Sequence, residues 1–179
     1  MQNAKFKMQK PRAMRPLHFA FCLLNCLLTA CGPASTPIQV SHSGVGAYEA
    51  ALALDKAGFA VAWYDTRDGN PEIYLRLLDE NGRPSGPERR LTETADMSYE
   101  ASLERVGDDF VVAWYEQTGD GRQTAMLGEW GRDGGRKWLQ AIAPASRNPV
   151  VATDGQAIVA AWIQADSDKS EWVWVGTWD

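Results

Sequence analysis

Cysteine and histidine are nearly absent from this chain. Only three of the 179 residues are cysteine and two are histidine, and the cysteines are Cys22, Cys26 and Cys31. Everything after residue 31 therefore lacks the means to form a disulfide, a cysteine-ligated metal centre or a cysteine nucleophile. His18 also lies near the start, so His42 stands alone in the body, and one histidine cannot build a zinc site. We expect no cofactor and no metal.

Acidic residues are missing from the first 30 residues, which carry five lysines and arginines. Beyond that point 13 lysines and arginines are outnumbered by 23 acidic residues, so the body carries a net charge of -10. A body of this charge repels phosphate backbones, and we expect no nucleic-acid partner.

The early cations precede an apolar stretch over residues 17–28. As a helix these 12 residues would span about 18 Å, too short for a bilayer core of roughly 30 Å. The layout is typical of a secretory signal peptide, and we expect residues 1–30 to be removed.

The end of this segment, Leu28-Thr29-Ala30-Cys31, resembles the lipobox of bacterial lipoproteins. The resemblance implies cleavage after Ala30, diacylglyceryl transfer to the Cys31 thiol and acylation of the new amino terminus. Two or three acyl chains anchor a protein firmly in a membrane. Residues 31–37 would form a short tether, and Gly32 after the cysteine favours the outer membrane. We therefore expect a lipid-anchored protein of the cell envelope.

The body is a repeat of about fifty residues. The segment FAVAWY at residues 59–64 recurs as FVVAWY at 110–115 and as IVAAWI at 158–163, offsets of 51 and 48. YEAAL at 48–52 likewise recurs as YEASL at 99–103. Each unit reads as short apolar strands separated by polar turns, which is typical of a β-propeller blade. We predict an all-β domain over residues 38–179, with three four-stranded antiparallel blades.

The unit, with GFAVAWY followed by DTRDGNPEIY and LDENG in its first copy, resembles the blades of sialidase-like, BNR-type β-propellers. The polar turns at residues 66–70, 118–122 and 166–170 keep the aspartate of that family's Asp-box but lose its glycine and lie one hairpin earlier. The turn at 166–170 also imitates part of a calcium loop, but Glu171 stands where the glycine should be, which favours an ordinary turn.

A sialidase-like enzyme needs three arginines for a carboxylate, a tyrosine nucleophile backed by a glutamate, and an acidic proton donor. None of these can be assigned here, and the family's Phe-Arg-Ile-Pro signature is absent. We therefore expect a non-catalytic binding or scaffold module for glycan or protein. The alternative is a sialidase-like glycoside hydrolase, or a degenerate or truncated relative of one.

Aromatic residues are the candidates for a binding face. Three tryptophans end equivalent strands and each is followed two residues later by a polar side chain. Indoles beside acids can stack on sugars or attract cations, but packing between blades would also explain their repetition. The six candidates are Trp63, Asp65, Trp114, Glu116, Trp162 and Gln164.

The ends of the repeat do not match a closed ring. Trp178 aligns with Leu78, so the last blade lacks its fourth strand, whereas residues 38–41 align with the fourth strand of the first blade at 89–92. Either two chains pair into a six-bladed ring, with residues 38–41 completing a blade of the partner, or the reading frame is truncated. We favour truncation slightly.

Overall fold

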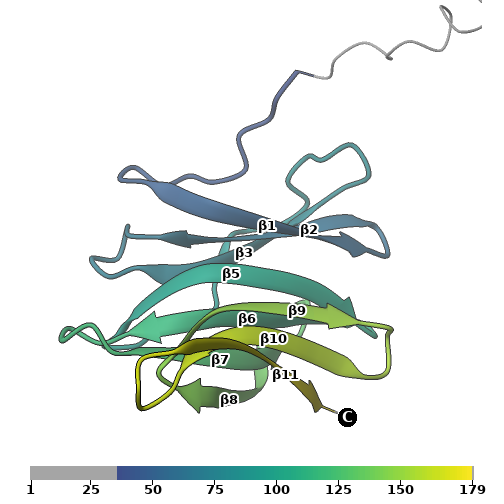
Figure 1. Ribbon diagram of the computed structural model, residues 1–179. Helices are drawn as coiled ribbons and strands as arrows, with labels where there is room; N and C mark the ends of the chain where they lie inside the picture. Colours follow the sequence, from purple (N-terminus) through teal and green to yellow (C-terminus); the bar gives the residue numbers. More distant parts are fainter. Residues whose placement is uncertain (1–35, 179) are drawn as a thin grey trace, which may run out of the picture. The chain divides into compact units, whose positions relative to one another are not determined.

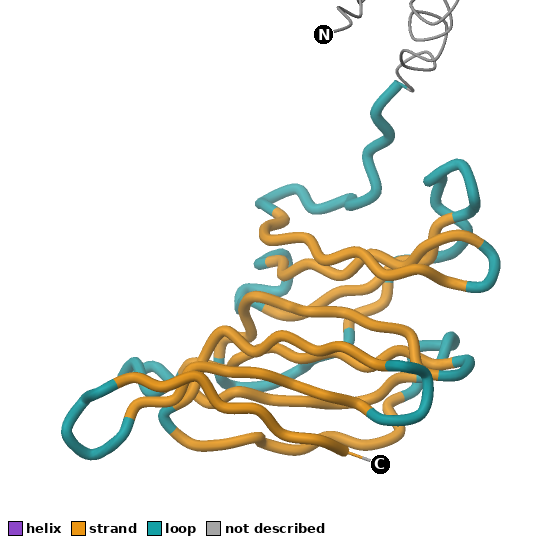
Figure 2. Tube along the Cα trace, turned by 45° about the vertical axis from the view of Figure 1, so that its right-hand side comes forward, coloured by secondary structure: helices purple, strands orange, loops and turns teal. Residues whose placement is uncertain are grey.

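The computed structural model describes residues 36–178, in which eleven strands and no helix are found (Figures 1 and 2). No helix in this range is long and apolar enough to cross a membrane. The expected signal peptide, the lipobox and Cys31 lie outside the described residues. Residues Ile38–Asp179 form one compact unit, and its architecture agrees with the all-β prediction.

Three antiparallel sheets, called blades 1 to 3 in chain order, make up the unit. Blade 1 is ordered β1(Ala47–Asp55), β2(Gly58–Asp65), β3(Glu72–Leu78), β4(Arg89–Arg90). Blade 2 is ordered β5(Met97–Val106), β6(Asp109–Gln117), β7(Gln123–Trp130), β8(Arg136–Pro144). Blade 3 is ordered β9(Ser146–Thr153), β10(Ile158–Ala165), β11(Glu171–Trp178). The third sheet thus has three strands among the described residues rather than the four predicted for each blade.

The blades follow one plan because their strands carry the same pattern. Each first hairpin turns at a glycine with positive φ: Gly58 at 135°, Gly107 at 59° and Gly155 at 96°. A Cβ on Gly58 would lie 2.3 Å from the carbonyl oxygen of Leu78, so only glycine fits there. The first strands of successive blades are neighbours, β1 beside β5 and β5 beside β9, which is the arrangement of a partial propeller.

Apolar side chains of neighbouring blades form the cores. One face of blade 1, with Ala60 and Ala62, packs against Phe110, Val112 and Trp114 of blade 2. Blade 2 turns its other face towards Val151 and Ile158 of blade 3 in a second cluster. The second strand of each blade was predicted to be apolar on both faces because it lies between layers, and these contacts confirm that prediction for β6.

Residues 38–41 were predicted to be a fourth strand, but they are not a strand in the structure. Val40 instead packs on the outer face of blade 1 against Val61, Trp63 and their neighbours. Its carbonyl oxygen accepts a hydrogen bond from the Arg76 side chain, at Nη1, at 2.6 Å. A strand in a sheet would instead form backbone hydrogen bonds with its neighbour. Residues 38–41 are therefore held on blade 1 by contacts with side chains and not by the expected pairing of strands.

Candidate functional site

The innermost strand of every blade is bulged at the same place. On β1 the pairing shifts between Tyr48 and Ala51, and on β5 it shifts between Tyr99 and Ser102. On β9 the shift falls opposite the stretch of β10 between Ala161 and Ile163. In each case one extra residue stands opposite the repeated tryptophan, so the bulge is part of the repeat.

A left-handed residue that is not glycine occupies each bulge. Glu49 has φ 51°, Glu100 has φ 54° and Asn148 has φ 49°. Residues other than glycine rarely adopt this conformation, and each instance costs about 1–3 kcal/mol. Strain of this kind gathers at functional sites, and here it recurs in all three blades.

The three bulges open into one shallow cavity of about 370 Å³, here called the inner-strand cavity. The Asn148 side-chain amide donates a hydrogen bond to a carboxylate oxygen of Glu100. Side chains from three different blades thus meet at one place. The cavity is lined by Glu49, Ala50, Glu100, Ala101, Ser102, Asn148, Pro149 and Val150.

The two carboxylates of this cavity influence each other. Glu49 is exposed and Glu100 is half-buried. Burial, followed by the negative charge of Glu49, raises the pKa of Glu100, and the Arg147 charge and the Asn148 amide only partly oppose this. The cavity therefore carries a carboxyl group that binds a proton more readily than an ordinary surface glutamate.

A row of tyrosines accompanies the carboxylates. Ring centroids are 5.1 Å apart between Tyr48 and Tyr64, 5.1 Å between Tyr64 and Tyr99, and 5.5 Å between Tyr99 and Tyr115. Burial, together with the charges of Glu100 and Glu49, raises the pKa of Tyr115 to about 12. Tyr48 is 48% exposed, so one end of the row offers an aromatic surface.

The three predicted tryptophans lie elsewhere and are buried. Trp63 is 2% exposed, Trp114 is fully buried and Trp162 is 9% exposed. The three tryptophans therefore do not form an exposed binding face. Two of them also contact an indole of the same blade: Trp114 lies 5.6 Å from Trp130, and Trp162 lies 6.4 Å from Trp178. Packing between blades, the other explanation of their repetition, accounts for the burial of Trp114, which shares a core cluster with blade 1, whereas Trp63 packs against Tyr74 and Leu78 of its own blade.

The polar residue two positions after each tryptophan lies close to the indole N–H of that tryptophan. Trp63 Nε1 donates to Asp65 Oδ2 at 3.3 Å, and Trp162 Nε1 donates to Gln164 Oε1 at 3.2 Å. Trp114 Nε1 approaches Glu116 without a hydrogen bond of normal geometry. Burial raises the pKa of Glu116. Asp65, Glu116 and Gln164 therefore have a structural role inside the blades, next to the buried indoles.

Of these three side chains, Asp65 accepts the most hydrogen bonds. Arg67 Nη2 donates to Asp65 Oδ2 at 2.5 Å, and the Ser43 hydroxyl donates to Oδ1 at 2.8 Å. Burial alone would raise the pKa of Asp65, but these donors and the Trp63 indole outweigh it and lower the pKa to about 2. Arg67 also pairs with Glu88, so the network fastens the end of β2 to the loop before β4.

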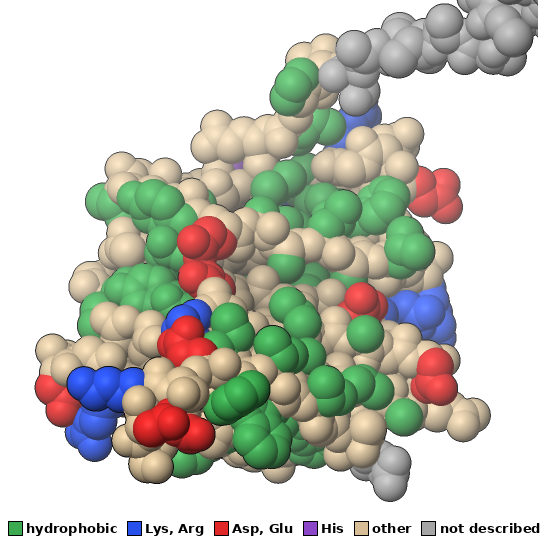
Figure 3. All heavy atoms as spheres, viewed as in Figure 1, with side chains coloured by type: hydrophobic (Ala, Val, Ile, Leu, Met, Phe, Trp, Pro, Cys, Tyr) green, Lys and Arg blue, Asp and Glu red, His purple; other side chains and the backbone are tan. Residues whose placement is uncertain are grey.

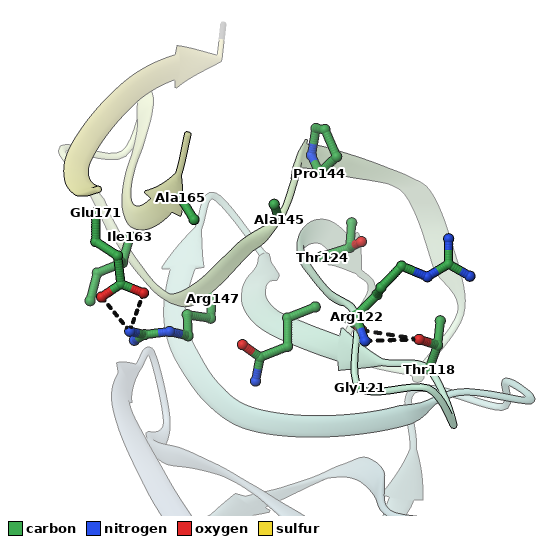
Figure 4. A pocket seen from close by; sticks show the side chains of 11 residues that line it. Thr118, Gly121, Arg122, Thr124, Pro144, Ala145, Arg147, Ile163, Ala165 and Glu171 are labelled. Carbon is green, nitrogen blue, oxygen red and sulfur yellow. Dashed lines mark hydrogen bonds and ion pairs between the residues drawn. The ribbon is translucent and has the colours of Figure 1, made fainter. Parts of the chain in front are cut away.

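A larger cavity of about 500 Å³ lies between the turn after β6 and the end of blade 3 (Figure 4). Its charged side chains are already partnered: Arg147 Nη2 contacts both oxygens of Glu171 at 2.7 Å. The Arg122 guanidinium donates from Nε to Asp120 Oδ2 at 3.0 Å, and the Arg122 backbone N–H donates to the Thr118 hydroxyl at 3.1 Å. Because these groups are satisfied within the chain, this cavity is a weaker candidate than the inner-strand cavity.

The polar turn after β10 is an ordinary turn. Asp166 Oδ1 accepts the backbone N–H of Asp168, and Asp168 Oδ1 accepts that of Ser170. Within residues 36–178 no group of three or more His, Cys, Asp or Glu side chains is arranged to hold a metal ion.

Comparisons with known proteins do not assign the chain to a family. No protein-family model matches it, and no curated protein matches it. An endo-arabinanase of family GH43 from Bacillus licheniformis matches with a TM-score of 0.48 and 11% identity, over 78% of this chain and 56% of that one. A GH43_1 enzyme from Xanthomonas citri, complexed with xylose, matches with a TM-score of 0.46 and 9% identity, over 72% and 43%.

This chain spans about half the length of those two structures. Both TM-scores lie below 0.5 and both identities are low, so no substrate and no mechanism is transferred from them. The partial propeller is established by the strand order and blade contacts of the chain itself.

The sequence carried one signal for the inner-strand cavity that the tryptophans obscured. A glutamate recurs at the same point of the first strand, in YEAAL and in YEASL, although the residues around it are apolar or aromatic. The sequence did not predict that these glutamate side chains point into the same cavity. A regular strand alternates its faces, and the bulge with its left-handed residue breaks that alternation.

Proposed function

We propose that this chain is a lipid-anchored β-propeller module of the cell envelope that binds glycan without turning it over. The inner-strand cavity is its binding site. One observation carries the proposal: the three blades each place a strained polar residue, Glu49, Glu100 or Asn148, at a single cavity. The half-exposed Tyr48 directly precedes Glu49 in the chain.

The chemistry of the cavity suits a neutral or amino sugar. Carboxylate oxygens accept hydrogen bonds from hydroxyl or ammonium groups, and the Asn148 amide adds a donor and an acceptor. The Tyr48 ring can stack on the apolar face of a pyranose. Two carboxylates repel an anionic sugar, which argues against sialic acid as the ligand.

The envelope location rests on the sequence. The lipobox-like residues ending in Cys31 and the short tether over residues 31–37 support a position of the binding module close to a membrane surface. Expression of the chain in bacterial cells labelled with radioactive palmitate tests this part: the wild-type chain is expected to incorporate label, and Cys31→Ala is expected to lose it.

An array of neutral, amino and acidic oligosaccharides tests the binding role. The wild-type chain should retain neutral or amino sugars, and the variant Glu49→Gln/Glu100→Gln should lose at least about tenfold in affinity. Glu80→Gln is the matched control, because Glu80 is an exposed turn residue away from the cavity. Retention of acidic sugars alone, or equal binding by the double variant, would contradict the proposed site.

A hydrolase is the second candidate, and one observation favours it. Glu100, with its raised pKa, lies in the same cavity as Glu49, and glycosidases use one protonated and one ionised carboxyl group. Turnover of aryl glycosides that disappears in Glu100→Gln would establish the hydrolase. Sugar binding without turnover supports the binding module.

A further inference from the structure

Three buried polar atoms of blade 2 lie together and have no hydrogen-bond partner among residues 36–178. They are Ser98 Oγ, Trp114 Nε1 and Glu116 Oε1. The Ser98 and Trp114 side chains are fully buried, and Glu116 is half-buried. Buried polar groups are almost always hydrogen-bonded, so three without a partner at one place indicate a small ligand from outside the chain.

The register of the sheet brings these three atoms to one place. Ser98 on β5 is the direct cross-strand partner of Glu116 on β6, so their side chains lie on the same face. Trp114 precedes Glu116 by two residues, and this spacing puts the indole on that face as well. The indole N–H approaches the Glu116 carboxylate without a hydrogen bond of normal geometry, which is where a bridging molecule is expected.

The other two blades satisfy the same positions with groups of the protein. In blade 1 the tryptophan Nε1 donates directly to Asp65, and in blade 3 it donates to Gln164. Arg67 gives Asp65 a further donor, but Thr118 stands at the corresponding position of blade 2. Ser146, the cross-strand partner of Gln164, forms two hydrogen bonds with backbone groups. Blade 2 is therefore the blade in which this position needs an added partner.

The chemistry of the three atoms selects the ligand. The Trp114 indole N–H can only donate a hydrogen bond, so it cannot ligate a cation. Burial raises the pKa of Glu116, and the negative charges of Asp96 and Glu72 raise it further. Acidic side chains also lie at several places on the face shown in Figure 3, so the surroundings oppose an anion. A small neutral molecule that both donates and accepts hydrogen bonds fits all three atoms.

We propose that Ser98, Trp114 and Glu116 bind one ordered water molecule. The water accepts the Trp114 N–H, donates to Glu116 Oε1 and forms its third hydrogen bond with the Ser98 hydroxyl, which gives it the about three bonds of a typical buried water. A water returns to solvent when a partner is removed, so its loss costs less than loss of the direct bond from Trp63 to Asp65.

The water site lies where blade 2 joins blade 1. The Ser98 backbone N–H donates to the Pro71 carbonyl at 2.8 Å, and the Asn70 side-chain amide donates to the Asp96 carbonyl at 2.6 Å. Both contacts hold the turn after β2 against the start of β5. The water completes this polar junction, just before the bulge at Glu100.

A crystal structure of the full chain in dodecyl maltoside, at about 1.5 Å resolution or better, tests the proposal. We expect a water oxygen within about 3.2 Å of all three atoms. The indoles of Trp63 and Trp162 are internal controls and should have no such water, because each donates directly to a side chain. A direct hydrogen bond from Trp114 to Glu116 without a water overturns the proposal, and so does a cation at this position.

Oxygen-17 relaxation dispersion, which counts long-lived buried waters, provides a readout in solution. Glu116→Met removes the acceptor at similar side-chain length and should lower the count by about one water. Glu116→Gln is the matched control, because its amide keeps an acceptor oxygen, and it should retain the wild-type count. Circular dichroism verifies that both variants fold. Equal counts in the wild type and a folded Glu116→Met protein overturn the proposal.

Discussion

Glu49 and Glu100 adopt the same left-handed backbone conformation, at φ 51° and 54°, at positions one repeat apart. The coincidence is a property of the blade, since each stands in a bulge opposite a buried tryptophan. Because both bulges open into the inner-strand cavity, repetition of a local backbone feature has gathered side chains from separate blades.

Glycine at a bulge should stabilise the fold. Glu100→Gly removes the penalty of a left-handed residue with a side chain and should raise the free energy of unfolding by about 1 kcal/mol. Glu104→Gly, in the regular part of the same strand, should lower it by about 0.5–1 kcal/mol. Urea denaturation measures both, and equal losses in the two variants would show that the bulge is not strained.

The stability of the fold should respond to the charge of Glu100. Its pKa is raised in the folded state, so the native protein holds a proton at a pH where the unfolded chain has released it. Stability from this group is therefore fully present below the ordinary value of 4.5 and is lost as pH rises through the folded pKa. Glu100→Gln should be more stable than wild type at pH 7, and this gain should vanish at low pH in thermal melts.

Asp65 should show the opposite pH dependence. Its pKa is lowered to about 2, so the stability it contributes is present above its ordinary value of 3.8 and is lost as pH falls from there towards 2. Asp65→Ala leaves Arg67 and the Trp63 indole without this partner and should cost roughly 3 kcal/mol at pH 7. If urea denaturation at pH 2 still shows the full difference between the two proteins, the assigned ionisation is wrong.

The repeated indoles should not be equivalent. Trp63→Phe breaks the hydrogen bond to Asp65, whereas Trp114→Phe removes an N–H that has no such bond. Both variants leave a similar cavity, so Trp63→Phe should be the more destabilising by about 1–3 kcal/mol. Denaturation of the two variants side by side decides this, and a larger loss in Trp114→Phe would contradict the hydrogen-bond assignment.

Repetition made the fold predictable from the sequence. Offsets of 51 and 48 residues fixed the number of blades, and the alternation around Trp114 fixed a strand buried on both faces. Periodicity reports burial well because a strand alternates its faces.

The site was less predictable because it depends on a break in that alternation. Trp63, Trp114 and Trp162 suggested a binding face because they recur, but recurrence also marks a residue that is buried in every repeat. Residues 38–41 aligned with a fourth strand, yet Arg76 holds the Val40 carbonyl on the face of blade 1. Contacts between residues far apart in the chain decided both outcomes.

The central claim is that bulges of different blades bring their carboxylates into one cavity. Titration of the Glu100 side-chain carboxyl by carbon-13 NMR, in wild type and in Glu49→Gln, tests it without a ligand. The account predicts a raised pKa in wild type that falls when the Glu49 charge is removed, while Glu80→Gln leaves it unchanged. A Glu100 pKa that is the same in wild type and in Glu49→Gln would contradict it.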